Sequence, residues 1–408
     1  MKTLPKLKII NDPIYGFITI PSELVFDLIE HKYFQRLRRI SQMGLSYIVY
    51  PGAHHTRFHH ALGAMFLMQK AVQVLQSKKI KISKAEEEAL YIAILLHDIG
   101  HGPFSHAMEN SIVENISHEN ISLWFMEALN REFDQKLSLA IQIFKNEYSR
   151  KFFHQLVAGQ LDMDRLDYLK RDSFYTGVSE GMVNSQRLIA MLNVKNDALV
   201  VEEKGIYSVE NFIMARRMMY WQVYLHKTGV VAEQLLVRVL KRAKYLSSKG
   251  IDLPASKPLK YFIDNTIGVD DFSEEVLQIF SKLDDNDIVS AMKNWVDTED
   301  FVLRNLCEML LNRDLLKVKV KSKPFLKVKV AEKNETFRVK HNISDEEAAY
   351  FVFSGTLENQ AYSMEKDTIN LLRKNGKIVD VAKASDQLNL EALSKSVVKY
   401  YLCYPKKQ

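Results

Sequence analysis

Apolar residues recur three and four positions apart along much of the chain, which is the spacing of amphipathic helices. The pattern is clearest in residues 61–75 and 85–96. Ser83 and Glu86 form a capping-box signature at the start of the second segment, in which each side chain bonds the backbone N–H of the other residue. We therefore predict a mainly α fold that is helical over most of residues 22–312.

Strand patterns interrupt the helical part in two places. Residues 7–21 read as two short strands around a turn at residues 11–13, and residues 198–208 read as a hairpin that turns at Lys204-Gly205. Beyond residue 312 the segments with strand patterns, two of them alternating lysine with apolar residues, are 316–321, 326–330, 377–382 and 396–404. We expect a helical domain at 1–312 with short β-hairpins, and a small α+β C-terminal domain at 313–408.

The composition is that of a globular protein, with 408 residues of which 47% are hydrophobic and 26% are charged. Cys307 and Cys403 have no Cys or His at ligand spacing, which argues against a disulfide framework and favours a reducing compartment. The first 11 residues lack the unbroken apolar core of a signal peptide, and no run of 18 apolar residues occurs. We expect a cytoplasmic protein with no membrane association.

The net charge of +6 fits two readings: a polyanionic partner such as nucleotide or nucleic acid, or a solvated lysine-rich surface. Lysines crowd residues 316–333, far along the chain from the histidines. The positive surplus is therefore not simply a feature of an active site.

Histidines point to chemistry, because eight of the 12 lie between His54 and His118 and imidazole is the commonest metal ligand. Within this window an apolar helical run ends in His97-Asp98, which offers an imidazole and a carboxylate to one ion. That pair suits Mn, Fe, Co, Ni, Zn or Mg better than Ca. We predict a divalent metal centre at which a bound water attacks a phosphate ester.

Further ligands must come from other segments of the chain. His59 and His60 are neighbours on a predicted helix, so one of them at most faces the ion. Three aspartates offer a similar choice a hundred residues later: Asp162, Asp164 and Asp167.

Four segments together carry a family resemblance: FQRLR at 34–38, PGAHHTRFHH at 51–60, LHDIGHGPFSH at 96–106 and DMDRLDY at 162–168. This set resembles the HD-domain phosphohydrolases. In particular it is similar to the deoxynucleoside triphosphate triphosphohydrolases, which include a mammalian enzyme with an added sterile-alpha-motif domain and bacterial relatives. The likeness runs from Lys8 to Leu236 and implies a helical HD-domain core without the sterile-alpha-motif domain.

The resemblance implies that a deoxynucleoside triphosphate is hydrolysed to a deoxynucleoside and inorganic triphosphate. The metal ligands of the family fall on His60, His97, Asp98 and Asp164. Its catalytic residues fall on His101, His106 and His118, with Glu109 as the acidic partner of His106. In this scheme His106 protonates the departing 5′ oxygen, a general-acid role that suits imidazole.

Substrate-binding positions follow from the same resemblance. The phosphate-binding positions fall on Arg57, Arg165 and Arg216, and a guanidinium can bind two phosphate oxygens at once. The sugar-binding positions fall on Gln42 and Asp172, which bond the 3′ hydroxyl, and on Tyr168 and Tyr224, which crowd the 2′ carbon.

The resemblance also implies a regulatory site for a guanine nucleotide and assembly into a dimer or tetramer. The matching positions are Lys8, Ile9, Glu30, Gln35 and Arg38. A nucleotide bound there would bridge subunits and shift an assembly equilibrium. The alternative is that residues 34–38 are simply an amphipathic helix.

Two other functions fit the same residues. A nucleotidase or phosphodiesterase of the same fold would share the metal centre, and the arginine clamp and sugar tyrosines argue against it. A non-catalytic nucleotide sensor or weak binder of single-stranded nucleic acid would use the basic surface, and its binding would fall steeply with salt. The full set of candidate ligands argues against a purely binding role, because a sensor needs no activated water.

Overall fold

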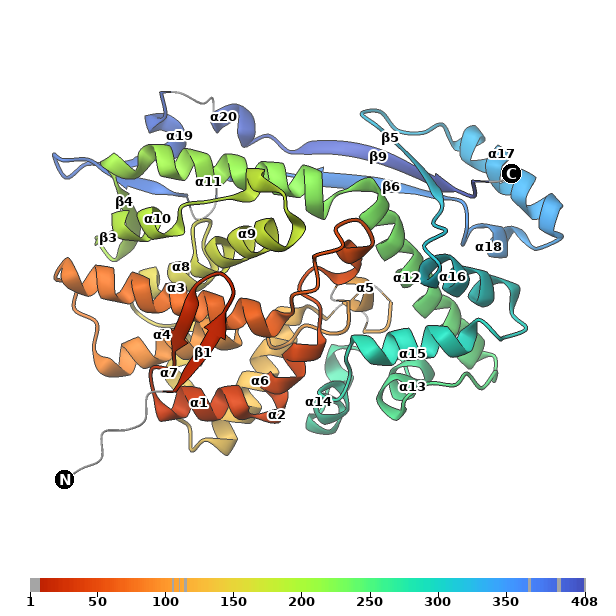
Figure 1. The fold of residues 1–408 in the computed structure, drawn as a ribbon, viewed down its shortest axis with the longest axis horizontal. Coiled ribbons are helices and arrows are strands. Elements are labelled where there is room, and N and C mark those ends of the chain that lie inside the picture. Colours follow the sequence, from red (N-terminus) through yellow and green to blue (C-terminus); the bar gives the residue numbers. More distant parts are fainter. Residues whose placement is uncertain are drawn as a thin grey trace.

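The structure is a computed structural model, and it describes residues 8–104, 106–109, 111–113, 116–365, 368–386 and 390–406. Figure 1 shows a body of helices with a long, narrow sheet along one edge. The body begins with a hairpin of β1 (Ile9–Asp12) and β2 (Gly16–Thr19), where the pattern predicted two short strands. The fold is mainly α with small sheets towards the C-terminus, as predicted.

The helices of the first half are α1 (Glu23–Glu30), α2 (Lys32–Gln35), α3 (Arg57–Ser77), α4 (Lys84–Leu96), α5 (His106–Glu109), α6 (His118–Glu132), α7 (Ser138–Phe144), α8 (Lys151–Ala158), α9 (Met163–Thr176) and α10 (Ser185–Met191). They continue with α11 (Ile206–Met219), α12 (Lys227–Ser248), α13 (Lys257–Asp264), α14 (Glu274–Phe280), α15 (Asp285–Trp295) and α16 (Phe301–Leu311). No described helix is both long and apolar enough to cross a membrane.

Helix α3 lies at the centre and packs against α4 and α9. The predicted capping box at Ser83 and Glu86 starts α4, and the apolar run up to Leu96 is fully buried. Because α4 ends inside the core, His97 and Asp98 are delivered to a buried position rather than to the surface.

The predicted hairpin at 198–208 is displaced towards the N-terminus. Its strands are β3 (Leu192–Lys195) and β4 (Ala198–Glu202), and the turn is at Asn196-Asp197 rather than at Lys204-Gly205. Asn and Asp tolerate the left-handed backbone that such a turn requires, and both residues have positive φ here. The residues from 206 onward belong instead to helix α11.

The C-terminal part contains β5 (Lys317–Lys321), β6 (Phe353–Asn359), β7 (Asn370–Leu372), β8 (Ile378–Asp380) and β9 (Val397–Tyr404), with helices α17 (Lys327–His341), α18 (Asp345–Ala348), α19 (Val381–Ala384) and α20 (Leu390–Leu393). One sheet has the order β5-β9-β6, and the other joins β7 and β8 to the β3-β4 hairpin. Three of the four predicted strands are present. The strand predicted at 326–330 is wrong, because five alternating residues cannot distinguish a strand from the start of a helix, here α17, which continues to His341. The division into domains at residue 312 stays a prediction.

Candidate metal centre and active-site cavity

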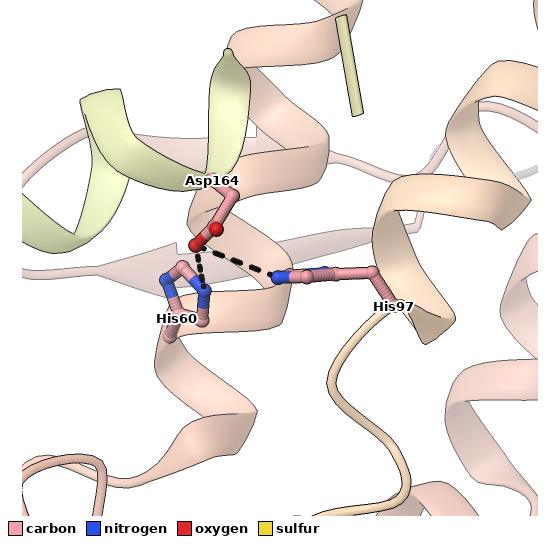
Figure 2. A group of neighbouring side chains, drawn as sticks. All are labelled: His60, His97 and Asp164. Carbon is pink, nitrogen blue, oxygen red and sulfur yellow. Dashed lines mark ion pairs between the residues drawn. The ribbon is translucent and has the colours of Figure 1, made fainter. Parts of the chain in front are cut away.

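Three helices bring four predicted metal ligands together. His60 lies in the first turn of α3, His97 and Asp98 follow α4, and Asp164 lies in the first turn of α9. Oδ1 of Asp164 lies 3.1 Å from Nε2 of His60 and 3.5 Å from Nε2 of His97, as Figure 2 shows. Oδ1 of Asp98 lies 3.5 Å from Nε2 of His97. We call His60, His97, Asp98 and Asp164 the metal cluster.

The outer nitrogen of each histidine in the metal cluster has a partner of its own. Nδ1 of His60 lies 2.8 Å from Oδ2 of Asp167, and Nδ1 of His97 lies 2.6 Å from the carbonyl oxygen of Ile94. Both Nε2 atoms are buried, face the carboxylates and make no hydrogen bond of good geometry to a described residue. Metal-binding histidines are usually held this way, with the distal nitrogen bonded so that the other one is aimed at the ion. The donor set therefore fits a divalent metal ion.

The electrostatics of the metal cluster favour anionic carboxylates. Burial alone would raise the pKa of Asp98, but His97, His101 and Arg57 outweigh it and hold that pKa well below its usual range. Burial is likewise outweighed at Asp164, whose pKa His60 and His97 lower. At His60 burial is opposed by Asp164 and Asp167, which raise its pKa to about 10. The two carboxylates are therefore anionic beside Arg57 and the imidazoles, and a divalent ion bound here would take over the positive charge that protonated His60 provides.

Beside the metal cluster lie two of the predicted catalytic histidines. The rings of His101 and His118 stack with centroids 3.8 Å apart, and Nε2 of His101 lies 3.3 Å from Oδ1 of Asp98. Burial and the nearby Arg57 lower the pKa of His101 well below its usual range, so its ring is neutral at pH 7. The side chains of the other two predicted catalytic residues, His106 and Glu109, lie outside the described residues.

A cavity of about 640 Å³ opens next to the metal cluster. Its wall includes many of the predicted residues: Gln42, Arg57, His118, Asp164, Arg165, Tyr168, Asp172 and Tyr224. Arg216 is not among the described residues of the wall. Its guanidinium lies 5.8 Å from the ring of Tyr220, and Tyr220 does line the cavity. The volume is within the range of small-molecule sites.

One end of the cavity is a hydrogen-bonded polar cluster. The hydroxyl of Tyr224 donates to Oδ2 of Asp172 at 2.8 Å, and Nε2 of His55 lies 2.6 Å from Oδ1 of the same carboxylate. The rings of Tyr168 and Tyr224 meet edge to face at 6.1 Å. Tyr224 belongs to a short π-helix, Tyr220–Tyr224, a form that often marks functional sites. His55 was not predicted from the sequence, because its contact with Asp172 spans 117 residues.

The two arginines on the cavity wall are held by acidic residues. Arg57 donates to Oδ2 of Asp98, and Arg165 donates to Oδ2 of Asp162 and to the carbonyl oxygen of Gly159. The side chain of Arg165 is still 26% exposed, on the cavity side. Both cations are therefore fixed at the cavity wall.

A buried aspartate from α15 holds two segments of the cavity wall together. Oδ2 of Asp285 accepts from the backbone N–H of Ser41 at 2.8 Å, and Oδ1 accepts from the backbone N–H of Phe104 at 2.9 Å. Ser41 precedes Gln42, and Phe104 follows the His-Asp motif and has φ of 49°. These contacts span 244 and 181 residues, so no local sequence signal could have revealed Asp285.

The predicted regulatory residues lie on the surface around β1, α1 and α2, and we call them the regulatory patch: Lys8, Ile9, Glu30, Gln35 and Arg38. Nε of Arg38 donates to Oε1 of Gln35 at 2.8 Å, and its guanidinium lies 3.6 Å from the ring of Phe58. Lys8, Ile9 and Glu30 are exposed. A hydrogen bond joins Gln35 to Arg38, whereas no hydrogen bond or ion pair between described side chains joins these two to Lys8, Ile9 or Glu30.

Comparison with known proteins places this geometry in a family. The HD domain model matches residues 57–169, and the model of an HD-associated region matches residues 183–253. Protein YwfO of Bacillus subtilis is 34% identical over 322 residues, covering 76% of this chain and 72% of YwfO. The deoxynucleoside triphosphate triphosphohydrolase SAMHD1 homolog of Dictyostelium discoideum is 32% identical over 255 residues, covering 58% of this chain and 49% of that protein.

A solved structure extends the comparison to the whole fold. The crystal structure of a phosphohydrolase from Bacteroides thetaiotaomicron VPI-5482 has 52% sequence identity and a TM-score of 0.95 to this chain. The match covers 98% of this chain and 100% of that one, so it includes the C-terminal sheets as well as the helical body.

Proposed function

Since this chain belongs to the HD-domain phosphohydrolases, which are metal-dependent, we propose that it hydrolyses deoxynucleoside triphosphates to deoxynucleoside and inorganic triphosphate. The observation that carries the proposal is the cavity, whose wall brings Asp164 of the metal cluster together with the fixed arginines and the Tyr224–Asp172 pair. A triphosphate nucleotide needs all three features side by side. The name of the Dictyostelium discoideum relative supports the same substrate class.

The phosphate chain lies along Arg57 and Arg165 in this proposal. Their guanidinium groups are already oriented by Asp98 and Asp162, so little conformational entropy is lost when they bind phosphate oxygens. A divalent ion held by His60, His97, Asp98 and Asp164 would lower the pKa of a water molecule and neutralise phosphate charge. Release of inorganic triphosphate requires attack at the α-phosphorus, so in this proposal the α-phosphate lies next to the metal cluster.

In this proposal the sugar lies against Tyr168 and Tyr224 and next to Asp172. Burial raises the pKa of both tyrosines well above the usual value, so their hydroxyls stay protonated. The hydrogen bond from Tyr224 to Asp172 fixes the ring, and a fixed ring excludes a 2′ hydroxyl by volume. Oε1 of Gln42 is buried without a partner among the described residues, which leaves it able to accept a bond from a 3′ hydroxyl.

Proton transfer falls to the histidines beside the metal cluster. His101 lies against Asp98 and stacks on His118, which reaches the cavity wall. We keep His106 as the general acid and Glu109 as its partner on the resemblance alone. His101 and His118 then orient the departing end of the substrate and carry the proton onward.

Regulation by a guanine nucleotide at the regulatory patch, with assembly into a dimer or tetramer, is the second half of the proposal. Arg38 links the patch to the core, because its guanidinium lies on Phe58, the residue next to Arg57 on α3. We further propose that residues 313–408 form a C-terminal domain that supports this assembly, and that the enzyme acts in the cytoplasm.

A nucleotidase or phosphodiesterase acting on another phosphate ester is the second candidate. The position of Arg216 favours it, because without that residue the described cavity wall presents two arginines rather than three. A substrate with fewer phosphate groups would need no third cation.

A product assay separates the two candidates. Metal-loaded protein is incubated with each deoxynucleoside triphosphate and its ribonucleotide counterpart, with and without GTP or dGTP, and the products are resolved by ion exchange. Inorganic triphosphate from deoxy substrates, lost in His97→Ala, supports the proposal. Orthophosphate or pyrophosphate would instead establish the second candidate, and no turnover under any condition would contradict both.

A further inference from the structure

The positive surplus of the chain lies in one segment outside the candidate active site. Residues 317–340 hold nine of the 56 lysine and arginine residues and two of the 50 aspartate and glutamate residues. This segment therefore carries a net charge of +7, and the rest of the chain sums to −1. The basic character of the whole protein comes from β5 and α17.

The lysines of β5 lie on the outer face of the β5-β9-β6 sheet. Alternate residues of a strand share a face, so Lys317, Lys319 and Lys321 lie together and all three are exposed. The other face carries Phe353 of β6, which the guanidinium of Arg238 on α12 covers at 3.3 Å. The sheet thus packs on α12 by one face and presents a row of lysines on the other.

Helix α17 adds positive charge to the same surface. Nζ of Lys333 lies 4.0 Å from the ring of Tyr404, and Nζ of Lys319 lies 5.9 Å from that ring, so strand and helix lysines meet around one tyrosine. Lys329 and Lys340 lie four and seven residues from Lys333 and therefore share its side of the helix. Figure 1 shows α17 beside β5 at one end of the molecule.

The strand lysines are not neutralised by the protein. The ion pairs of this region include those of Arg338 with Glu335 and Asp345 and of Lys406 with Asp314, and no ion pair between described residues involves Lys317, Lys319 or Lys321. Like charges in a row repel one another, and a polyanion relieves that repulsion. Lysines on an edge strand also discourage sheet-to-sheet pairing, but that purpose does not explain the lysines of α17.

We propose that the outer face of β5, together with Tyr400 of β9 and with α17, binds the sugar–phosphate backbone of single-stranded nucleic acid. Alternate lysines on a strand are about 7 Å apart, a regular row suited to an extended polyanion. Tyr400, half-buried and directly opposite Lys321 in the sheet, offers a ring on which a base can stack. We call this the lysine face, and it contains none of the residues of the candidate active site.

An anionic membrane suits this surface less well. The exposed apolar residues of α17, Val328 and Val339, lie on the same stripe of the helix as Glu332 and Glu335. Helices that lie in a membrane surface present an uninterrupted apolar face, and two carboxylates would have to enter the lipid here.

The test measures binding of a fluorescein-labelled single-stranded 20-mer of DNA by anisotropy, using the full chain. With about four phosphates neutralised, we expect affinity to fall roughly 50-fold between 50 and 200 mM salt. The variant K317E/K319E/K321E should lose at least tenfold in affinity and show a shallower salt dependence. The matched control is K81E/K136E/K282E, which makes the same charge change at exposed lysines elsewhere and should retain binding.

Circular dichroism and thermal unfolding are used to check that both triple variants fold. An equal loss of affinity in the two triple variants would overturn the proposal that the lysine face is the binding site, since net charge alone would then explain binding. Tighter binding of phosphatidylserine vesicles or of a polyglutamate peptide than of the 20-mer would replace the nucleic acid as partner. His97→Ala should bind the 20-mer unchanged, so a failure of the proposed hydrolysis would not affect this result.

Discussion

The metal cluster and the regulatory patch were located through the same resemblance, yet their physical settings are opposite. Each histidine of the metal cluster is buried and held by a second contact, such as Asp167 behind His60. In the regulatory patch, Ile9 is 54% exposed, and Lys8 and Glu30 are exposed as well. Arg38 is also exposed, and its contacts are with Gln35 and Phe58.

The difference shows how much each location constrains function. Asp98 is buried beside Arg57, and Oδ1 of Asp164 faces Nε2 of both His60 and His97, so these side chains form one connected set of metal-ligand type. An exposed arginine is compatible with many roles. The metal cluster is therefore argued from its own geometry as well as from the resemblance, whereas the regulatory patch follows from the resemblance.

The largest effect is expected from His60→Ala, compared with His59→Ala as its neighbouring control. The His60→Ala variant should lose most of its bound metal and its phosphohydrolase activity, because it lacks one of the four protein ligands proposed for the catalytic ion. His59, whose Nδ1 accepts from the backbone of Thr56, should lose only about 1 kcal/mol of stability. The metal content of both variants is measured by mass spectrometry, and equal metal loss in the two would contradict the assignment of His60 as a ligand.

Asp167→Asn should have the next largest effect. Its carboxylate aligns the ring of His60, and loss of such a partner weakens metal affinity by about 10- to 100-fold. Asp167 also binds Arg171, whose other partner is Asp12, so Asp12→Asn tests whether that arginine alone matters. Competition with a chelator gives the affinities. The same weakening in both variants would mean that Asp167 acts on the fold and not on the ion.

The residues of the metal cluster were predicted from the sequence, but the residues that support them were not. His97-Asp98 stands out because it ends a buried apolar run, and the resemblance chose His60 and Asp164 from their neighbours. Asp167 was left among three alternatives, and His55 and Asp285 were missed, since their contacts span more than 100 residues. The helices α3 and α4 were predicted from periodicity and capping, whereas the 192–202 hairpin was misplaced because two turn signals lie close together.

Asp285→Asn should act on substrate binding rather than on the metal. Ser41 and Phe104 donate to different oxygens of Asp285, and in Asn one of these oxygens is replaced by an NH2 group that cannot accept, so one of the two cavity segments is released. Loss of one such bond is worth about 1–1.5 kcal/mol, or roughly tenfold in KM. The control is Asp287→Asn, which removes a capping bond on the same helix away from the cavity. A fall in kcat with KM unchanged would rule out this positioning role.

Glu86→Gln should lower stability without affecting the metal cluster. Burial raises the pKa of Glu86, but Ser83, Arg150 and Tyr148 outweigh it and lower the pKa to about 2. Because the folded pKa lies below the unfolded value of about 4.3, the stabilisation is present above pH 5 and is lost as pH falls towards 2. Urea unfolding should show a deficit of about 1 kcal/mol at pH 7 that shrinks below pH 4.

For Glu86 the neighbouring control is Glu88→Gln, which removes the same charge from α4 outside its capping box. A deficit in Glu86→Gln that is constant from pH 7 to pH 3 would show that the hydrogen bonds of Glu86, and not its charge, stabilise the helix start.

Arg38→Ala tests the regulatory patch, and its effect on basal turnover should be the smallest of those predicted here for the two sites. The exposed guanidinium bonds Gln35 and stacks on Phe58, contacts worth about 0.5–1 kcal/mol, so turnover without added nucleotide should change less than about twofold. If the regulatory patch binds a guanine nucleotide, stimulation by GTP should disappear in Arg38→Ala and partly return in Arg38→Lys. A tenfold fall in basal turnover would instead show that Arg38 supports the start of α3, where Phe58 adjoins Arg57. The regulatory patch would then be part of the framework of the metal cluster rather than a second site.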